Sequence, residues 1–381
     1  LDLHALTFAE ELVHDDPAAR IVFLTMGPPA AREMLVDCLS RVPGEAILLT
    51  DKAFAGADTG ATAYSLAMAI RRVQHEMFDD QCEYAIVTGM QSVDGDTAQV
   101  PPQIAEELGI DHIAYAQSVR RDDEQNPPWI IRRIAAEGIE DVHPRHCPVL
   151  ITLTASTSPL FRSFAAAREA RIADIHEWSA ESVGADRSRI GLKGSWTQVH
   201  HLFSPSEART KTCKFVDDPA ELVASMKAAY EVAEAGATVP CVDQAYDLAG
   251  REPTYRGEFW VFAEPEGDGV RSVSLELVGV ARDLANCLDE KVAAVLAIDE
   301  AGDRPEALIA AGADIVYVLE HPLLARFDPI GHKSVLADLV RERKPQVMLF
   351  GASPLGRELA PRVAYACRSG LTADCTQLEI G

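Results

Sequence analysis

Apolar residues recur along this chain in short runs, and most runs are followed by a polar loop and then by a segment with helical spacing. Runs typical of buried strands cover residues 20–25, 46–50, 84–88 and 149–154, and helical segments cover 1–13, 30–39, a stretch ending near 73, 103–108 and 165–171. Strand, loop and helix in repeated order predict a parallel α/β sheet. Between residues 112 and 154 the pattern changes to short strands with polar turns, which indicates a hairpin extension at 129–134.

The chain opens on a helical segment, with Leu3, Leu6, Phe8 and Leu12 as its apolar positions. No strand precedes this helix in the sequence, although a parallel α/β domain normally begins with one. We therefore expect that N-terminal residues are missing from this sequence.

A second α/β pattern begins at Glu258 and repeats the layout of the first. Its strands are predicted at 291–298, 314–319 and 346–350, and its helices at 305–311 and 332–341. In both halves one apolar strand ends at a glycine, its loop contains a second glycine, and the next helix has proline in its opening turn, where proline is tolerated. The sequence therefore predicts one fold used twice, as two pseudo-equivalent, doubly wound and mostly parallel α/β domains.

Residues 204–257 lack this pattern, apart from one amphipathic helix at about 219–235. From the pattern alone this stretch looks like a tail and a linker; the bounds that we predict, a first domain at residues 1–228, a linker at 229–257 and a second domain at 258–381, rest on the family resemblance described below.

The loop at residues 89–103 is the best candidate for a ligand site. It joins a strand to a helix, and in a parallel sheet this junction lies at the carboxyl edge, where N–H groups of the helix start can bind a phosphate. Gly89 and Gly95 permit close backbone approach, while Ser92, Thr97 and Gln99 can donate or accept hydrogen bonds.

Two carboxylates in the same loop, Asp94 and Asp96, would repel a phosphate. They fit such a site only if they cap the helix or bind ribose hydroxyls. The plain alternative is an ordinary polar loop with a helix cap, and this stretch alone does not decide between the two.

A second loop of small residues, at positions 51–62, also follows a predicted strand and is placed to touch the same ligand. A third loop, at 158–164, carries Pro159, Leu160, Phe161 and Phe164. Apolar side chains at a loop tip either pack into the core, which is the commoner outcome, or contact a partner.

The composition narrows the classes of function. With 381 residues the chain is long enough for two or three domains, and 48% hydrophobic and 25% charged residues are typical of a water-soluble protein. No membrane span or secretory signal is evident, so we expect a cytoplasmic protein. A net charge of −24 without a basic patch argues against nucleic acid as a partner.

The sequence shows no catalytic or metal-binding constellation. Its eight cysteines are scattered without a CxxC pair, which favours reduced thiols over metal ligands or disulfides. No nucleophile and base pair is evident, and a hydrolase is disfavoured because no Gly-x-Ser-x-Gly elbow occupies a strand-to-helix turn.

Several longer motifs resemble the electron transfer flavoproteins over nearly the whole chain. Residues 1–228 are similar to the β subunit and residues 258–381 to the first domain of the α subunit. The motifs are Leu24–Pro29, Phe54–Thr59, Asp94–Val100 and Gly191–Ser195 in the first part, and Trp260–Glu264, His321–Leu324, Gly351–Arg362 and Gly370–Cys375 in the second. The resemblance implies a β–α fusion, in which a further α-subunit domain carrying its own FAD would follow residue 381.

The resemblance implies a nucleotide at the β site, which is AMP in ordinary members and a second FAD in electron-bifurcating members. The loop at 54–62 favours FAD, because its small residues resemble those of the bifurcating members and leave room for a flat ring. Such members take electrons from NADH and send one toward ferredoxin or flavodoxin and the other toward an acyl-CoA dehydrogenase. Whether the chain acts as an enzyme stays open. The alternatives are a non-bifurcating electron transfer flavoprotein that holds a structural AMP and a nucleotide-binding scaffold without a redox role.

Carried onto this sequence, the resemblance assigns roles to particular residues. Thr59 and Thr62 would bond one flavin edge with Asp58 nearby, the loop around 94–99 would hold phosphates and ribose, and the adenine would lie near Met26. The candidate cofactor-binding residues are Asp2, Met26, Gly56, Ala57, Asp58, Thr59, Thr62, Gly89, Gln91, Ser92, Asp94, Gly95, Asp96, Thr97, Ala98 and Gln99.

The family's partner-anchoring loop matches the third loop of this chain. A leucine in the middle of that loop docks the partner dehydrogenase in the family, and this position reads Phe164 here. The candidate partner-binding residues are Pro159, Leu160, Phe161 and Phe164. A larger apolar side chain would suit a different pocket on the partner.

Overall fold

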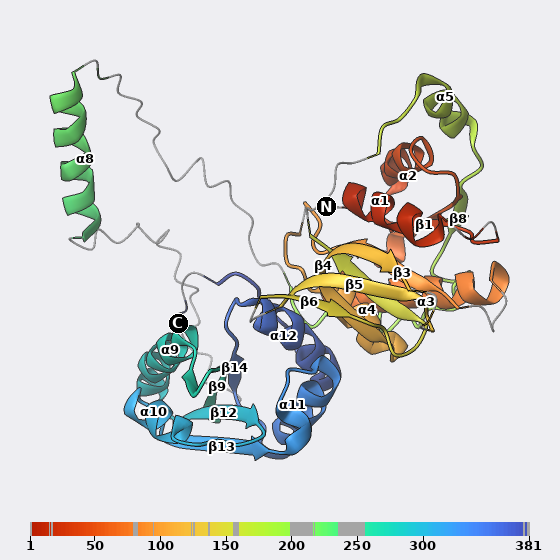
Figure 1. Cartoon of the computed structure of the whole chain (residues 1–381). Helices are drawn as coiled ribbons and strands as arrows, with labels where there is room; N and C mark the ends of the chain where they lie inside the picture. Colours follow the sequence, from red (N-terminus) through yellow and green to blue (C-terminus); the bar gives the residue numbers. More distant parts are fainter. Residues whose placement is uncertain are drawn as a thin grey trace. The chain divides into compact units, whose positions relative to one another are not determined.

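A computed structural model describes residues 2–14, 16, 18–78, 83–93, 95–122, 124, 126–135, 138–154, 160–198, 216, 218–234, 256–375 and 378 (Figure 1). The chain divides into two compact units, Leu1–Gln198 with Arg256–Leu378 and Val199–Tyr255 with Glu379–Gly381. In the second unit the structure describes one helix, α8 (Pro219–Glu234), where the sequence predicts one. The proposed boundaries at residues 228 and 258 stay a prediction.

The first half, residues 2–198, is a mixed α/β structure in which helices follow parallel strands. Its helices are α1 (Asp2–Val13), α2 (Arg32–Leu39), α3 (Thr59–Glu76), α4 (Val100–Leu108), α5 (Phe164–Ile172) and α6 (Gly191–Gly194), with 3-10 turns η1 (Pro29–Ala31) and η2 (Lys52–Phe54). Its strands are β1 (Val22–Met26), β2 (Glu45–Leu49), β3 (Ala85–Gly89), β4 (Asp111–Arg121), β5 (Trp129–Ala135), β6 (Gly138–Val142), β7 (Val149–Leu153) and β8 (His176–Trp178).

These strands form two sheets. One has the parallel order β1-β2-β8, with Leu24 opposite Ile47. The other has the order β3-β7-β4-β5-β6, in which β3, β7 and β4 are parallel and β4-β5-β6 are antiparallel. The antiparallel part confirms the predicted hairpin. Strand β4 is longer than predicted and is interrupted by a register shift around Tyr115, whose φ is 60°.

The second half, residues 256–375, has the parallel sheet order β13-β12-β9-β14 with helices on both faces (Figure 1). Its helices are α9 (Ser272–Leu288), α10 (Arg304–Ala310), α11 (Pro329–Arg343) and α12 (Pro354–Cys367), with the 3-10 turn η3 (Pro322–Leu324). Its strands are β9 (Phe259–Ala263), β10 (Pro265–Glu266), β11 (Gly269–Val270), β12 (Val292–Ile298), β13 (Ile315–Glu320) and β14 (Val347–Leu349). The doubly wound α/β class predicted from the sequence is confirmed.

Alternation along β9 explains why both faces of this sheet are covered. Phe259 and Val261 point into the cluster that contains α9 residues, whereas Trp260 and Phe262 point into the cluster formed with α11 and α12. A strand that is apolar on both sides must be buried on both sides, as in other parallel sheets.

Helix α4 of the first half contacts helices α11 and α12 of the second. Glu106 on α4 pairs with Lys333 Nζ at 2.6 Å and with Arg362 NH1 at 3.4 Å, while the Tyr365 hydroxyl donates to Glu107 Oε2 at 2.7 Å. These contacts bring α12 alongside the helix that follows the candidate loop.

In the described part of the chain, no helix combines the length and apolar character that crossing a membrane requires. The cysteines at positions 38, 147, 287, 367 and 375 are free thiols.

Candidate functional site

A single side-chain hydrogen bond joins the two loops that the sequence singles out. Thr59, the first residue of α3, donates from Oγ1 to Gln99 Oε1, which precedes α4, at 2.8 Å. Behind this bond, Ala63 of α3 packs with Ile104 and Ala105 of α4. The starts of both helices therefore lie side by side.

The Gln99 side chain, a candidate ligand of the nucleotide, also links the loop to other parts of the protein. It is 2% exposed, and its Nε2 lies 3.5 Å from the Leu371 carbonyl oxygen, to which it donates. The loop is thus fastened to the second half as well as to α3.

The backbone of the loop adopts conformations that non-glycine residues rarely take. Asp96 and Ala98 have φ values of 49° and 55°, and the Asp96 amide closes a turn on the Ser92 carbonyl at 3.0 Å. Each such residue costs roughly 1–3 kcal/mol, so it persists where the surroundings enforce it, often at functional sites. Ala98 is followed by Gln99 in the right-handed helical region, and such an alternation is one that can form an anion-binding concavity of consecutive N–H groups.

The amide donors for an anion come from the loop and from Val100, because the next two residues are prolines. Pro101 and Pro102 have no N–H, and the Gln103 amide already donates to the Gln99 carbonyl. Of the two roles that would fit Asp96 to a phosphate site, capping α4 is not the one found, because Gln99 occupies the cap position; ribose binding stays a prediction. Asp96 is instead exposed, and Asp94 lies outside the described residues.

Asp58 fixes the start of α3. Its Oδ1 accepts from the Ala61 amide at 2.9 Å, and its Oδ2 accepts from the amides of Trp196 and Thr197 at 2.7 and 2.9 Å. Its own amide donates to Ser195 Oγ at 2.8 Å. Asp58 therefore immobilises the loop, and the role beside a ring that the resemblance assigns to it stays a prediction.

Close backbone packing of residues 191–194 supports the small-residue loop at 51–62. Gly191 and Gly194 leave no space for a Cβ, which would clash with the carbonyls of Ala53 and Arg189. At Gly60 a Cβ would lie 2.9 Å from the Trp196 ring. Sequence reasoning missed Trp196, although it directly follows the Gly191–Ser195 motif, which was the available signal.

The other candidate residues lie at the ends of strands, in the loops after them and in the first turns of helices. Asp2 Oδ1 accepts from the Gly89 amide at 2.9 Å, so the first turn of α1 reaches the end of β3. Met26 ends β1, and Thr62 lies one turn into α3. Gly56 has a φ of 73°, which favours glycine, and both Gly56 and Gly95 are exposed. Ala57, Gln91 and Thr97 are half-buried, whereas Ser92 is exposed.

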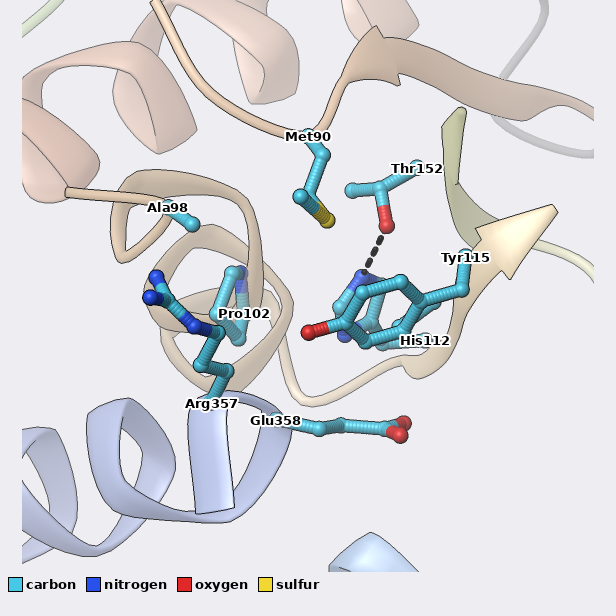
Figure 2. A pocket seen from close by; sticks show the side chains of 9 residues that line it. Met90, Ala98, Pro102, His112, Tyr115, Thr152, Arg357 and Glu358 are labelled. Carbon is cyan, nitrogen blue, oxygen red and sulfur yellow. Dashed lines mark hydrogen bonds between the residues drawn. The ribbon is translucent and has the colours of Figure 1, made fainter. Parts of the chain in front are cut away.

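A buried polar cluster lies behind the loop, around a cavity of about 10 Å³, which is room for one water molecule (Figure 2). Met90 and Ala98 of the loop line it from one side and Glu358 of α12 from another. His112 Nε2 shares a hydrogen bond with Thr152 Oγ1 at 3.2 Å.

The charges around this cavity shift its titratable groups. Burial lowers the pKa of His112 well below the usual range, and the nearby guanidinium groups of Arg362 and Arg133 act in the same direction. Burial raises the pKa of Glu358, and Arg133 NH1 at 3.4 Å opposes that shift. The cluster therefore favours a neutral imidazole beneath the loop.

The third loop separates its apolar side chains by position. Leu160 packs against the cluster around Leu35, and Arg41 donates to the Leu160 carbonyl at 2.6 Å. Phe161 and Phe164 are 90% and 95% exposed, so they favour a partner contact over core packing. Pro159 lies outside the described residues.

Comparison with known proteins matches both halves to one family. The family model described as electron transfer flavoprotein domain matches residues 1–183 and 259–381. Among curated proteins, Protein FixA of Bradyrhizobium diazoefficiens is 42% identical over 218 residues, which cover 57% of this chain and 74% of the relative.

Two further relatives bear on the two parts of the chain. The caffeyl-CoA reductase-Etf complex subunit CarD of Acetobacterium woodii is 34% identical over 204 residues, covering 54% of this chain and 74% of the relative. The electron transfer flavoprotein subunit alpha of Thermoanaerobacterium thermosaccharolyticum is 42% identical over 123 residues, covering 32% of this chain and 37% of the relative.

Proposed function

The chain belongs to the electron transfer flavoprotein family, and on that premise we propose that its first half binds FAD and exchanges electrons with an acyl-CoA dehydrogenase. The observation that carries the proposal is the bond between Thr59 and Gln99, which joins the start of the helix after β2 to the start of the helix after β3. A dinucleotide needs two such contact regions, one for its phosphates and one for its ring.

The residues at this edge fit an FAD. Ala55 and Gly56 are exposed and small, so a flat ring can approach the backbone there. A Cβ at Gly95 would meet Ser92 Oγ only at 3.6 Å, so the space above the phosphate loop is open. The positive φ of Ala98 helps to turn loop amides toward a pyrophosphate.

On this proposal each residue has a limited task. Thr59 gives its hydroxyl proton to Gln99 and so offers only oxygen lone pairs to a ring N–H, while Thr62 adds a second hydroxyl one turn further along α3. Asp2 and Met26 would border the adenine side. When bound, FAD supplies the electron-carrying ring, and the protein supplies orientation and electrostatics.

We further propose that NADH is the electron donor and that a ferredoxin or flavodoxin is a second acceptor, as in the bifurcating members of the family. The small-residue loop at 54–62 supports this choice, since it leaves the backbone accessible to the ring. The relative CarD is named as a subunit of a caffeyl-CoA reductase-Etf complex, which supports a CoA-dependent dehydrogenase as partner. Phe161 and Phe164 are the proposed anchors.

An AMP-holding scaffold is the second candidate, because the same loop amides suit a single phosphate. The proposals differ in what the small-residue loop contacts: an isoalloxazine ring in the first, and no ring in the second. Extraction of nucleotide from the purified 381-residue chain, followed by chromatography, separates them. One FAD per chain supports our proposal, and one AMP without FAD would refute it.

A further inference from the structure

The second half has a crevice of the kind that doubly wound domains use for ligands. Strand β9 pairs in parallel with β12 on one side and with β14 on the other, so the strand order reverses between β9 and β14. Ligands of such sheets bind at the carboxyl end of this switch point. Two helices start there, α9 after β9 and the 14-residue α12 after β14.

A buried carboxylate occupies this crevice. Glu264 directly follows β9 and is 1% exposed. Its Oε1 accepts from Ser353 Oγ at 2.7 Å, and Ser353 is the cap of α12, whose Oγ accepts from the Gly356 amide at 3.0 Å. The backbone of the loop passes close to this oxygen at Gly351, where a Cβ would lie 2.8 Å from Oε1.

The second oxygen of Glu264 is poorly satisfied. Among the described residues no donor forms a hydrogen bond to Oε2, and the nearest cation is Arg271 Nε at 3.6 Å. Arg271 precedes α9, and the Glu264 amide donates to Ser274 Oγ in the first turn of that helix. The carboxylate therefore lies where both helix starts direct their positive ends.

The first half differs at the equivalent junction. Among the described residues of its loop at 90–99, the one acidic side chain, Asp96, is exposed. In the described part of that loop no buried carboxylate covers the helix start, whereas Glu264 covers the one in the second half.

We propose that the second half retains the anion site of its fold and that the Glu264 carboxylate fills it, so that removing this side chain creates a site for inorganic phosphate or a phosphate monoester. Ser353 and the first turn of α12 would then bind the exogenous anion in place of the carboxylate. This inference does not depend on which nucleotide the first half binds.

The test compares Glu264→Ala with wild type and with Glu264→Gln, which keeps the volume and removes the charge. Thermal unfolding is followed in inorganic phosphate and in potassium chloride of equal ionic strength. A phosphate-dependent shift in unfolding temperature that is equal in all three proteins is attributed to phosphate binding by the first half. The unfolding midpoint temperature of Glu264→Ala should rise in phosphate by about 2 °C or more beyond the rise that all three proteins share. This is the shift that saturating a weak site gives in a protein of this size.

A folding defect in Glu264→Ala is also decisive. If this variant is unfolded in chloride, phosphate must restore the wild-type circular dichroism spectrum. Adding Ser353→Ala to Glu264→Ala should at least halve the excess shift or the rescue, because it removes a hydroxyl donor. Equal phosphate responses in all three proteins, or an unfolded Glu264→Ala that phosphate does not restore, would overturn the proposal.

Discussion

Asp58 and Gln99 show that side chains chosen from the sequence as ligands also hold the protein together. Asp58 accepts three backbone amides at the start of α3, and Gln99 connects that helix to α4. A carboxylate satisfied in this way adds little free acceptor capacity for a ligand. The residues left available at this edge are the loop amides, the glycines and the two threonine hydroxyls.

Gly95 gives the cleanest residue-scale test of the phosphate loop. Because a Cβ fits there at 3.6 Å from Ser92 Oγ, we expect Gly95→Val to fold normally. The branched side chain would occupy the approach of the phosphates, so nucleotide content should fall at least tenfold. Gly279→Val on α9, where a Cβ meets nothing within 4 Å, is the control. Full nucleotide content in Gly95→Val would place the phosphates elsewhere.

His112 makes stability depend on pH in a defined direction. Its folded pKa is lowered by burial, whereas an unfolded chain protonates histidine at about pH 6.5, so the stability from His112 is present above that pH and is lost as pH falls. Between pH 7.5 and 5 we expect wild type to lose up to about 2 kcal/mol more than His112→Gln.

Urea unfolding at several pH values measures the effect of His112. The exposed His176→Gln is the matched control and should follow wild type. Parallel pH profiles for wild type and His112→Gln would show that His112 does not titrate as its burial requires.

At the scale of elements, strands and helices with long periodic patterns were predictable from the sequence, and the supports of the site were not. The strand ending at Gly89 and the hairpin at 129–134 follow from alternation and turn signals. Strand β8 has three residues, too few for a pattern. The role of Trp196 depends on its contact with Gly60, which is distant in sequence.

Helix α5 and the loop before it carry the prediction on partner docking. Phe164 is the first residue of α5 and is 95% exposed, so Phe164→Ala should leave stability and flavin content unchanged. If the Phe164 ring is an anchor, removing it should weaken dehydrogenase binding by about tenfold or more. Affinity for the dehydrogenase is measured by surface plasmon resonance. Ile172→Ala, at the exposed end of the same helix, is the control. Equal affinities of Phe164→Ala and wild type would exclude the anchor.

Glu106 is one of the two carboxylates of α4 that bond to residues of α12. Glu106 pairs with Lys333 and with Arg362, which is 1% exposed. Glu106→Gln removes the carboxylate that is hydrogen-bonded to this buried guanidinium, although Glu358 and Asp111 still act on it, so the unfolding free energy should fall by about 2 kcal/mol. Asp338→Asn, which removes an exposed ion pair with Arg341, should change it by less than about 1 kcal/mol. Denaturant titration measures both unfolding free energies. Comparable losses in the two variants would contradict the greater contribution assigned to Glu106.

At the scale of the whole molecule, the chain combines two α/β halves that differ in the side chains described at the start of the helix after the glycine loop. The repeat was predictable, because the strand, glycine loop and proline-opened helix recur in both halves. The difference was not predictable, because Glu264 lies far in sequence from the loop at 351–353 that it contacts. The half whose described loop residues include no buried carboxylate is the one proposed to hold the cofactor.

The nucleotide that the purified chain carries tests this account most directly. The chain is denatured, and the released nucleotides are identified by chromatography with mass detection and quantified against protein. We predict one FAD per chain in wild type and none in Gly95→Val. AMP in place of FAD, or FAD retained in full by Gly95→Val, would contradict the proposal that the first half holds a flavin at its carboxyl edge.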